Sequence, residues 1–407
     1  MAKNIIFCAD GTWNGPGETD DQGRPTPSNV LKLFESLAGT IAATGLQNEM
    51  ERSASEPGGG VAQIAKYIHG VGDGGNQLVR FAEGSTGAGI LARLVRGYTF
   101  ISRNYAQGDR IVITGFSRGA YTARALAGLI IKQGLLDSSA MGLAGSGDSA
   151  AYAAGMAAWG QYQSSRHRSG NQDTLANLAK VMTEIQDKFY TVLLRPPPLR
   201  FVNNVPLKAV AVWDTVGALG IPDYNKDDEA RIDVFEFVDQ QLAPAVESGF
   251  QAVAIDEMRV DFTPTLWQRR DQGGIEQVLF PGAHADVGGG YPELGNECGL
   301  SDGALQWMID RMLGVGVRFE SIAHHAPNPK GVAHRPWLGA AYTLQPKASR
   351  EFPTGLALSQ SAVDRINAGA VPVEQAPDAP YRPNNLAGSY YLMDWSGPAS
   401  HVEIVAV

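Results

Sequence analysis

The stretch GFSRGAY (115–121) places one serine, Ser117, between two glycines that stand two residues before and two residues after it. It follows the apolar run RIVIT, which is typical of a buried strand, and precedes a segment with helical spacing of apolar residues. When a strand turns into a helix through one residue, the flanking positions are pressed together, and a side chain there would clash. Gly115 and Gly119 therefore predict a nucleophile elbow that lifts the Ser117 hydroxyl to the positive end of a helix, ready for acyl transfer. The simpler alternative is that Ser117 only caps that helix.

A serine hydroxyl is a weak nucleophile at neutral pH, so it needs a general base, most often a histidine, within hydrogen-bonding reach. Among the seven histidines, His284 directly follows a strong strand signal and lies in the glycine-rich turn PGAHADVGGGY (281–291). We therefore predict that His284 is the base. His69, beside the turn of YIHGVG, and His401, late in the sequence, are the second and third candidates.

The base in turn needs a carboxylate that orients its ring. Asp214 ends the strand-like run LKAVAVW, and Asp286 lies two residues beyond His284. Either carboxylate could accept a hydrogen bond from the imidazole, and each could instead bind backbone N–H groups of its own turn. We favour Asp214 because separate strands normally supply the acid and the base around such an elbow, and we keep Asp286 as a supporting residue.

The oxyanion that forms during acyl transfer is stabilised by backbone N–H groups. The loop ADGTWN (9–14) follows the first predicted strand, and its glycine lets the backbone approach a ligand closely. We expect the donors to be the N–H of Arg118, directly after the serine, and one N–H from Gly11 or Thr12. Asp10 would hold this loop by accepting hydrogen bonds from backbone amides.

The element pattern explains how such distant residues could meet. Short apolar runs alternate with helical segments, which predicts an α/β protein with a doubly wound, mostly parallel sheet. Because parallel strands end at one edge of the sheet, the predicted site residues converge there, in the Ser–Asp–His chain order of an α/β-hydrolase. The expected strands are 4–9, 110–115, 207–213, 250–256 and 276–282, and the expected helices are 28–38, 89–106, 118–132 and 227–243.

We expect residues 1–407 to form a single α/β-hydrolase domain. Residues 138–195 are rich in Ala, Gly, Ser and Gln, and they predict a helical cap or lid inserted into it. The polar, glycine-rich stretches 14–29 and 47–61 are predicted to be loops, and the segment after residue 327 is predicted to wrap the core with a few short strands.

Composition excludes several classes of protein. A formal charge of −9 without long like-charge runs argues against nucleic acid as a partner. Two cysteines are too few for a disulfide scaffold or a cysteine-type zinc site, so no metal is expected. GSTGAG (84–89) is similar to a dinucleotide-binding glycine pattern but follows no predicted strand, so no organic cofactor is expected. We find no transmembrane segment and no signal peptide, and we expect a protein that is cytoplasmic as synthesised or exported without such a peptide.

Several longer motifs carry a family resemblance. The motifs are ADGTWN (9–14), GFSRGAYTARALAG (115–128), WDTVGA (213–218), AIDEMR (254–259), PGAHADVGGGY (281–291), LSDGALQWM (300–308) and YRPNNL (381–386). Together they resemble the catalytic domain of type VI secretion phospholipase effectors, formerly an uncharacterised α/β-hydrolase domain family.

The resemblance implies an α/β-hydrolase fold, a triad of Ser117, Asp214 and His284, and hydrolysis of glycerophospholipid acyl esters. With the residue patterns, it leads us to expect a serine esterase, lipase or phospholipase A that cleaves a small-molecule or lipid ester through an acyl-enzyme. Two alternatives stay open: an antibacterial effector with a secretion or immunity partner, and a non-catalytic binding domain that keeps the fold. A metal-dependent phosphohydrolase is a weaker alternative.

Overall fold

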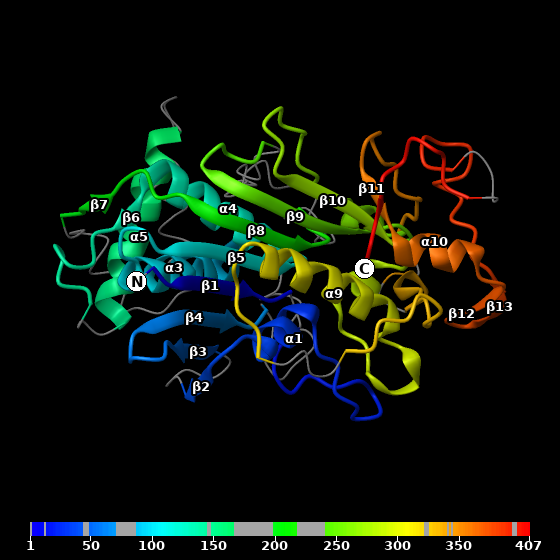
Figure 1. Ribbon diagram of the computed structural model, residues 1–407, viewed down its shortest axis with the longest axis horizontal. Helices are drawn as coiled ribbons and strands as arrows, with labels where there is room; N and C mark the ends of the chain where they lie inside the picture. The colour runs from blue at the N-terminus through cyan, green and yellow to red at the C-terminus, as the bar shows by residue number, and fades with distance from the viewer. Residues whose placement is uncertain are drawn as a thin grey trace.

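The computed structural model describes residues 2–11, 14–43, 49–70, 87–144, 148–166, 198–217, 241–320, 325–339, 342, 345–392 and 397–407. Within these residues the chain forms a ten-stranded sheet, which crosses the molecule in Figure 1. Its strands, in spatial order, are β14 (Ile404–Val405), β11 (Ala357–Ser359), β10 (Ile275–Phe280), β9 (Val246–Ala254), β8 (Leu207–Trp213), β5 (Arg110–Phe116), β1 (Asn4–Ala9), β4 (Val61–Ile68), β3 (Glu49–Ser55) and β2 (Thr40–Ala43).

The pairings from β14 to β4 are all parallel, and β3 and β2 extend one edge of the sheet in antiparallel fashion. Successive side chains of a strand point to opposite faces, so a strand covered on both sides needs apolar residues throughout. β1 meets this requirement, since Ile5 and Phe7 join one core while Ile6 and Cys8 join the other. The predicted α/β, mostly parallel fold is confirmed.

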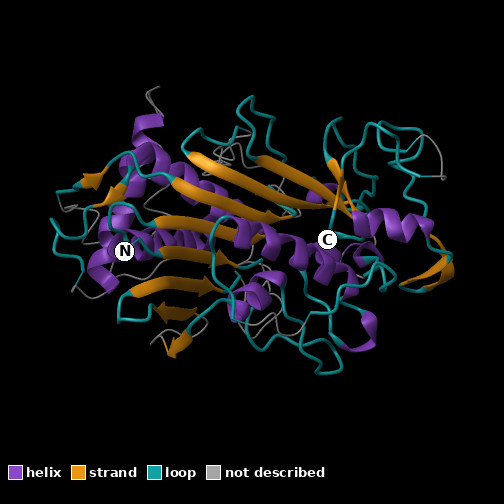
Figure 2. Cartoon of the chain, viewed as in Figure 1, coloured by secondary structure: helices purple, strands orange, loops and turns teal. Residues whose placement is uncertain are grey.

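Helices cover both faces of the sheet, as Figure 2 shows. The first core lies under α3 (Gly87–Asn104), α4 (Arg118–Gln133) and α5 (Asp148–Arg166). The second core lies under α1 (Asn29–Ser36) and α9 (Gly299–Gly314). Helices on both sides of parallel strands are the arrangement that leaves the carboxyl ends of those strands free to build a site.

The five predicted strands are present as β1, β5, β8, β9 and β10, and three predicted helices appear as α1, α3 and α4. The fourth predicted helix, at 227–243, falls almost entirely on residues outside the described ranges. The prediction of a loop at 47–61 is wrong, because β3 occupies much of it and β4 begins at its end. β3 lies near the sheet edge and is only partly buried, so its sequence EMERSAS carries no apolar run that would reveal it.

The segment after residue 327 adds to the main sheet through β11 and β14. Helix α10 (Gln360–Asn367) follows β11, and a two-stranded hairpin of β12 (Ala370–Val373) and β13 (Ala376–Pro380) follows the helix. The smaller elements are β6 (Leu135–Leu136), β7 (Phe201–Val202), α8 (His284–Gly288), η1 (Val260–Phe262), η2 (Leu294–Asn296) and η3 (Pro336–Leu338).

Helix α5 lies within the segment 138–195 for which a cap was predicted. It packs through Met156, Trp159 and Tyr162 into the core that α3 and α4 share. Residues 167–197 lie outside the described ranges, so a lid over the site stays a prediction. None of the helices in the described part of the chain is long and apolar enough to cross a membrane.

Candidate active site

Ser117 occupies a strained turn between β5 and α4. Its backbone angles are φ 57° and ψ −123°, a combination that non-glycine residues rarely adopt. A Cβ atom at Gly115 would lie 2.4 Å from the carbonyl oxygen of Gly119, and one at Gly119 would lie 2.1 Å from that of Ala9. The two glycines therefore let the turn pack against itself and against the end of β1. Ser117 stands at the N-cap position of α4, but its side chain makes no capping hydrogen bond, which removes the simpler explanation for this serine.

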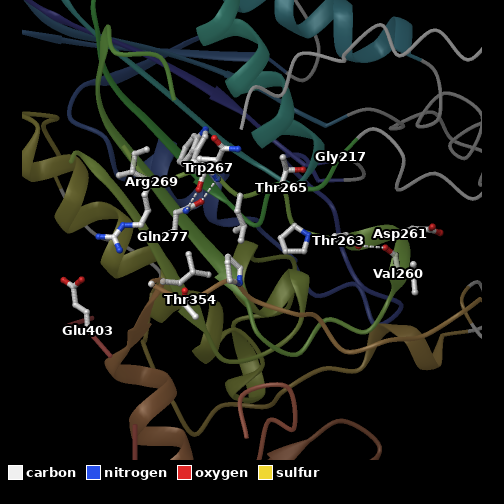
Figure 3. Close-up of a pocket in the computed structure, with 17 residues that line it drawn as sticks. Gly217, Val260, Asp261, Thr263, Thr265, Trp267, Arg269, Gln277, Thr354 and Glu403 are labelled. Atoms are coloured by element: carbon white, nitrogen blue, oxygen red, sulfur yellow. Dashed lines mark hydrogen bonds between the residues drawn. The ribbon is translucent and has the colours of Figure 1, made fainter. Parts of the chain in front are cut away.

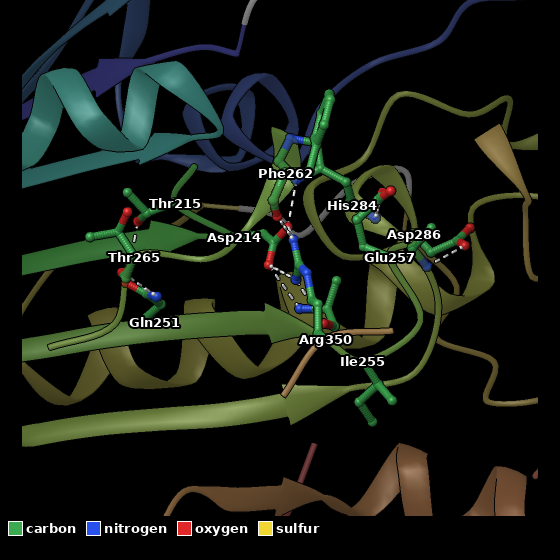
Figure 4. Close-up of polar contacts among 12 residues, drawn as sticks. Asp214, Thr215, Gln251, Ile255, Glu257, Phe262, Thr265, His284, Asp286 and Arg350 are labelled. Carbon is green, nitrogen blue, oxygen red and sulfur yellow. Dashed lines mark hydrogen bonds and ion pairs between the residues drawn. The ribbon is translucent and has the colours of Figure 1, made fainter. Parts of the chain in front are cut away.

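His284 and Asp214 form a buried pair at the same edge of the sheet (Figure 4). His284 is the first residue of α8, directly after β10, and Asp214 follows β8. The distance from His284 Nδ1 to Asp214 Oδ2 is 2.5 Å, and Asp214 has no exposed surface. Asp214 Oδ1 also accepts a hydrogen bond of 2.9 Å from the backbone N–H of Ala254 in β9, so three neighbouring strands hold this pair in place.

Burial and charge set the ionisation of the pair. Burial alone would raise the pKa of Asp214, but the positive charge of Arg350 and the hydrogen bonds from His284 and Arg350 hold that pKa well below its usual value. Burial lowers the pKa of His284, and its interactions with Asp214 only partly oppose this effect. At neutral pH the aspartate is therefore ionised and the imidazole is neutral, which are the states that a general base and its orienting carboxylate require.

The other ring nitrogen, His284 Nε2, is buried and has no hydrogen-bond partner among the described residues, so no hydrogen bond joins it to Ser117 Oγ. Ring packing nevertheless holds this imidazole beside the elbow. The ring centroid of Phe116, the residue before the serine, lies 4.5 Å from that of His284, and Phe262 meets the same imidazole edge to face at 5.0 Å. Phe116 fits there because Gly288 has no side chain, since a Cβ at Gly288 would lie 1.9 Å from the Phe116 ring.

The competing residues lie in other environments. Asp286 Oδ1 is 2.6 Å from Nδ1 of His334, and Asp286 Oδ2 accepts the backbone N–H groups of Ala283 and His334. Asp286 therefore supports the loop of His284 and is not the partner of its ring. His69 follows β4 and lies beside the loop after β1. Nε2 of His401 forms a hydrogen bond of 2.8 Å with the carbonyl oxygen of Tyr390.

The loop after β1 approaches the elbow closely. A Cβ atom at Gly11 would lie 3.3 Å from the Cβ of Ser117. The N–H of Gly11 donates to Asp10 Oδ1 at 2.7 Å, however, so in this conformation Gly11 does not offer the donor that was predicted for it. Asp10 also accepts the hydroxyls of Ser28 and Tyr67, which fits its predicted role in holding the loop. Thr12 lies outside the described residues, and Arg118 is the first residue of α4.

Two charged groups near the pair were not predicted from the sequence. Arg350 forms a two-pronged ion pair with Asp214, and no local pattern around it indicates this role. Glu257 accepts the backbone N–H of His284 at 3.2 Å and is itself paired with Arg259, whose guanidinium carbon lies 3.5 Å from the centre of the Phe262 ring. The family motif AIDEMR (254–259) contains Glu257 and Arg259 and is the signal that could have identified them.

A cavity of about 830 Å³ lies beside the segment that follows Phe262 (Figure 3). The segment 263–269 forms one wall, with Gly217, Asp261 and Glu403 among the other lining residues. Ser117, Asp214 and His284 do not line this cavity, so it does not define the reacting position.

Comparisons with known proteins agree with the resemblance seen in the motifs. The family described as "T6SS, Phospholipase effector Tle1-like, catalytic domain" matches residues 3–311. Uncharacterized protein YEL023C of Saccharomyces cerevisiae is 31% identical over 148 residues, which are 33% of this chain and 18% of the yeast protein.

Two solved structures were also found. A crystal structure of an uncharacterized protein from Pseudomonas aeruginosa has a TM-score of 0.40 and 17% identity, covering 81% of this chain and 48% of that one. The structure of the Tle1 effector bound to the VgrG spike from the type 6 secretion system has a TM-score of 0.36 and 19% identity, covering 72% of this chain and 52% of that one. This chain thus spans about half, or less, of each of these proteins.

The family match extends over most of the chain and includes the elbow, the strand ends and the turn that carry the buried pair. The chain therefore belongs to the family of type VI secretion, Tle1-like phospholipase effector catalytic domains.

Proposed function

We propose that this protein is a serine hydrolase that cleaves carboxylic esters, with the acyl esters of glycerophospholipids as its substrate class. The observation that carries the proposal is the environment of His284. Its Nδ1 is bound to an ionised, buried Asp214, while its Nε2 has no partner among the described residues and its ring packs beside the strained turn of Ser117. The family to which the chain belongs supports the phospholipid class.

In the proposed reaction, Ser117 Oγ attacks the carbonyl carbon of the ester while His284 Nε2 takes the hydroxyl proton. The new C–O bond turns the carbonyl oxygen into an oxyanion, which the N–H of Arg118 at the start of α4 is suited to stabilise. His284 then gives its proton to the leaving alcohol as the old C–O bond breaks. Water then attacks the acyl carbon while His284 Nε2 takes one of its protons. The bond from the acyl carbon to Ser117 Oγ breaks, His284 returns the proton to Oγ, and the carboxylic acid leaves.

Asp214 keeps the proton of the imidazole on Nδ1, so that Nε2 faces the substrate as a base. The unmade hydrogen bond between Nε2 and Ser117 Oγ is compatible with this role, because catalytic hydrogen bonds in ligand-free enzymes are often long and tighten only when substrate binds.

A fluorophosphonate probe tests the activated serine, since it labels a serine only where a neighbouring base raises its nucleophilicity. We expect labelling at Ser117, located by peptide mass spectrometry, and its loss in Ser117→Ala. Ser55→Ala, which alters an exposed serine of β3, is the matched control and should label like the parent. A parent protein that fails to label, or a Ser117→Ala variant with parental ester turnover, would refute the mechanism.

The substrate class needs a separate assay. The parent and Ser117→Ala are compared on short p-nitrophenyl esters, triglyceride emulsions and phosphatidylethanolamine–phosphatidylglycerol vesicles, with free fatty acid and lysophospholipid as the readouts. We expect lysophospholipid release by the parent only. Turnover of short esters with no release from vesicles would keep the serine mechanism and exclude phospholipid as the substrate.

The family also supports a biological setting in which the protein is exported without a signal peptide by a type VI secretion machine. A secretion-apparatus partner and an immunity protein in the producing cell then belong to the proposal. Directing the parent and Ser117→Ala to the periplasm of a susceptible bacterium tests it, because only the parent should lyse the cells. Equal growth of the two strains would argue against an antibacterial role.

A further inference from the structure

Arg350 reaches the buried pair from the C-terminal part of the chain. Its Nη1 lies 2.7 Å from Asp214 Oδ1 and its Nη2 lies 2.9 Å from Asp214 Oδ2, so the guanidinium and the carboxylate meet end-on through two hydrogen bonds (Figure 4). The side chain of Arg350 is 4% exposed and that of Asp214 is fully buried. Such a fork fixes the plane of a carboxylate, which a single point contact does not.

The fork is itself held in position by backbone groups around the site. Arg350 donates to the carbonyl oxygens of Ala254, at the end of β9, and of Phe262, whose ring packs on the imidazole. Among the described residues, Asp214 accepts four hydrogen bonds: two from Arg350, one from the N–H of Ala254 and one from His284.

The segment that carries Arg350 is attached to the same loops. The N–H of Ala348 donates to the carbonyl of Met258 at 2.9 Å. Asn385, from the motif YRPNNL, donates to the carbonyls of Ile255 and Arg350. Tyr381 of the same motif donates to Asp256, which in turn accepts the N–H of Gly282, two residues before His284. The motif thus joins the tail to the segment after β9 and, through Asp256, to the turn before His284.

We propose that Arg350 is a positioning residue of the active site, and that the segment 345–392, which lies beyond the family match, completes that site by locking Asp214 in the orientation that serves His284. The inference rests on the proposed function. It explains how a fully buried carboxylate stays ionised, since a paired charge in a dry site costs far less than an isolated one.

Arg350 also limits how strongly Asp214 attracts a proton to His284. An ion-paired aspartate presents less net negative charge to the imidazole than a bare one, so a neutral residue at 350 should raise the pKa of His284. Among the described residues, the charged groups that face the imidazole are Asp214, Glu257 and Arg259, with Arg350 behind the aspartate. The variants described next replace Arg350 and leave these three groups in place.

The test is the pH dependence of kcat/KM for p-nitrophenyl butyrate in Arg350→Met and Arg350→Lys. The acid limb of the profile is the pH range in which kcat/KM falls as the pH is lowered. For Arg350→Met we expect the midpoint of this limb to move upward by about one pH unit or more, with a loss of roughly 10- to 100-fold in kcat. Arg350→Lys keeps the charge but not the fork, so its acid limb should stay near that of the parent while kcat still falls about tenfold.

Arg365→Met is the matched control. Arg365 is a fully buried arginine of α10 in the same tail, and its guanidinium carbon lies 5.3 Å from the centre of the Tyr381 ring. It donates to the carbonyls of Pro329, Gly331 and Pro372, and none of its described hydrogen bonds reaches Asp214 or His284. This change should lower thermal stability and leave the acid limb where it is. If Arg350→Met behaves in the same way, losing stability without a shift of the limb, Arg350 is a structural residue only and the inference is wrong.

Two further variants decide how the result is interpreted. If Arg350→Met does not fold, as judged by circular dichroism, Arg350→Lys decides, because a parental kcat in that variant contradicts positioning by the fork. Ser117→Ala separates the two proposals. If it retains activity, the serine mechanism itself has failed; if it is inactive while both Arg350 variants match the parent, only the role of Arg350 is refuted.

Discussion

The aromatic ring of Phe116 lies against the imidazole of His284, with 4.5 Å between the ring centroids and 34° between their planes. This contact joins the turn that presents Ser117 to the short helix that begins with His284. Because protein interiors are close-packed and transmit displacements, we expect the Phe116–His284 contact to set the position of Ser117 relative to His284.

Gly288→Ala should damage catalysis by breaking this contact. The new Cβ would lie between 1.9 and 2.3 Å from three atoms of the Phe116 ring, so the ring must move. We expect kcat to fall by about 100-fold, since misplacing reacting groups by about 1 Å has effects of that size. Gly303→Ala, in α9, is the control, because its Cβ would meet nothing closer than 3.6 Å. A parental kcat in Gly288→Ala would show that the Phe116 contact does not position the site.

Gly119→Ala should disrupt the elbow itself. Its Cβ would stand 2.1 Å from the carbonyl oxygen of Ala9 and 2.5 Å from that of Asp10, and rigid backbone cannot yield cheaply. We expect a loss of about 1–3 kcal/mol in the free energy of unfolding, measured by urea denaturation, together with a large loss of kcat.

Gly128→Ala lies in the same helix, and among the described residues its Cβ would meet only the Tyr162 hydroxyl, at 3.5 Å. There the gain in helix propensity should leave stability unchanged or raise it by up to about 1 kcal/mol. Equal stability losses in the two variants would contradict the packing argument for Gly119.

Asp214→Asn should lower kcat by about four orders of magnitude, because an amide that donates toward Nδ1 favours the wrong imidazole tautomer. Asp286→Asn tests the rival carboxylate. Asp286 binds His334 and the start of α8, so its loss should act on loop stability and cost activity about tenfold or less. Steady-state kinetics on a short ester distinguish the two, and a larger effect at Asp286 would reverse the assignment.

The pH profile of the parent follows from the lowered pKa of His284, which has burial as its largest cause. The base works as neutral imidazole, so kcat/KM should fall as the pH drops through the folded pKa of His284, and that pKa lies below the usual value of 6.5. The value of kcat/KM at pH 6.5 should therefore already exceed half of its plateau. The pKa of Asp214 lies lower still, so the aspartate remains ionised across this limb. An acid-limb midpoint above 6.5 would contradict the environment described for the ring.

Much of the fold and part of the site could be predicted from local patterns. The strands β1, β5, β8, β9 and β10 are buried on both faces, so their apolar runs are visible in the sequence. The elbow could be foreseen because the steric demand of its turn falls on Gly115 and Gly119, both within two residues of the serine. By contrast, β3 is polar and near the edge, and nothing in its residues distinguishes it from a loop.

The partners of the site residues could not be decided in the same way. The sequence favoured Asp214 over Asp286 only on the general layout of such folds. The order of the strands brings Asp214 to the ring of His284, while Asp286 pairs with His334. Arg350 stands 136 residues from Asp214, and its neighbours in the chain carry no trace of the ion pair. Local sequence determined where turns, glycines and reactive side chains fall, because these depend on steric contacts over a few residues. Tertiary structure decided which side chains meet, because that depends on how distant strand ends and loops assemble at one edge of the sheet.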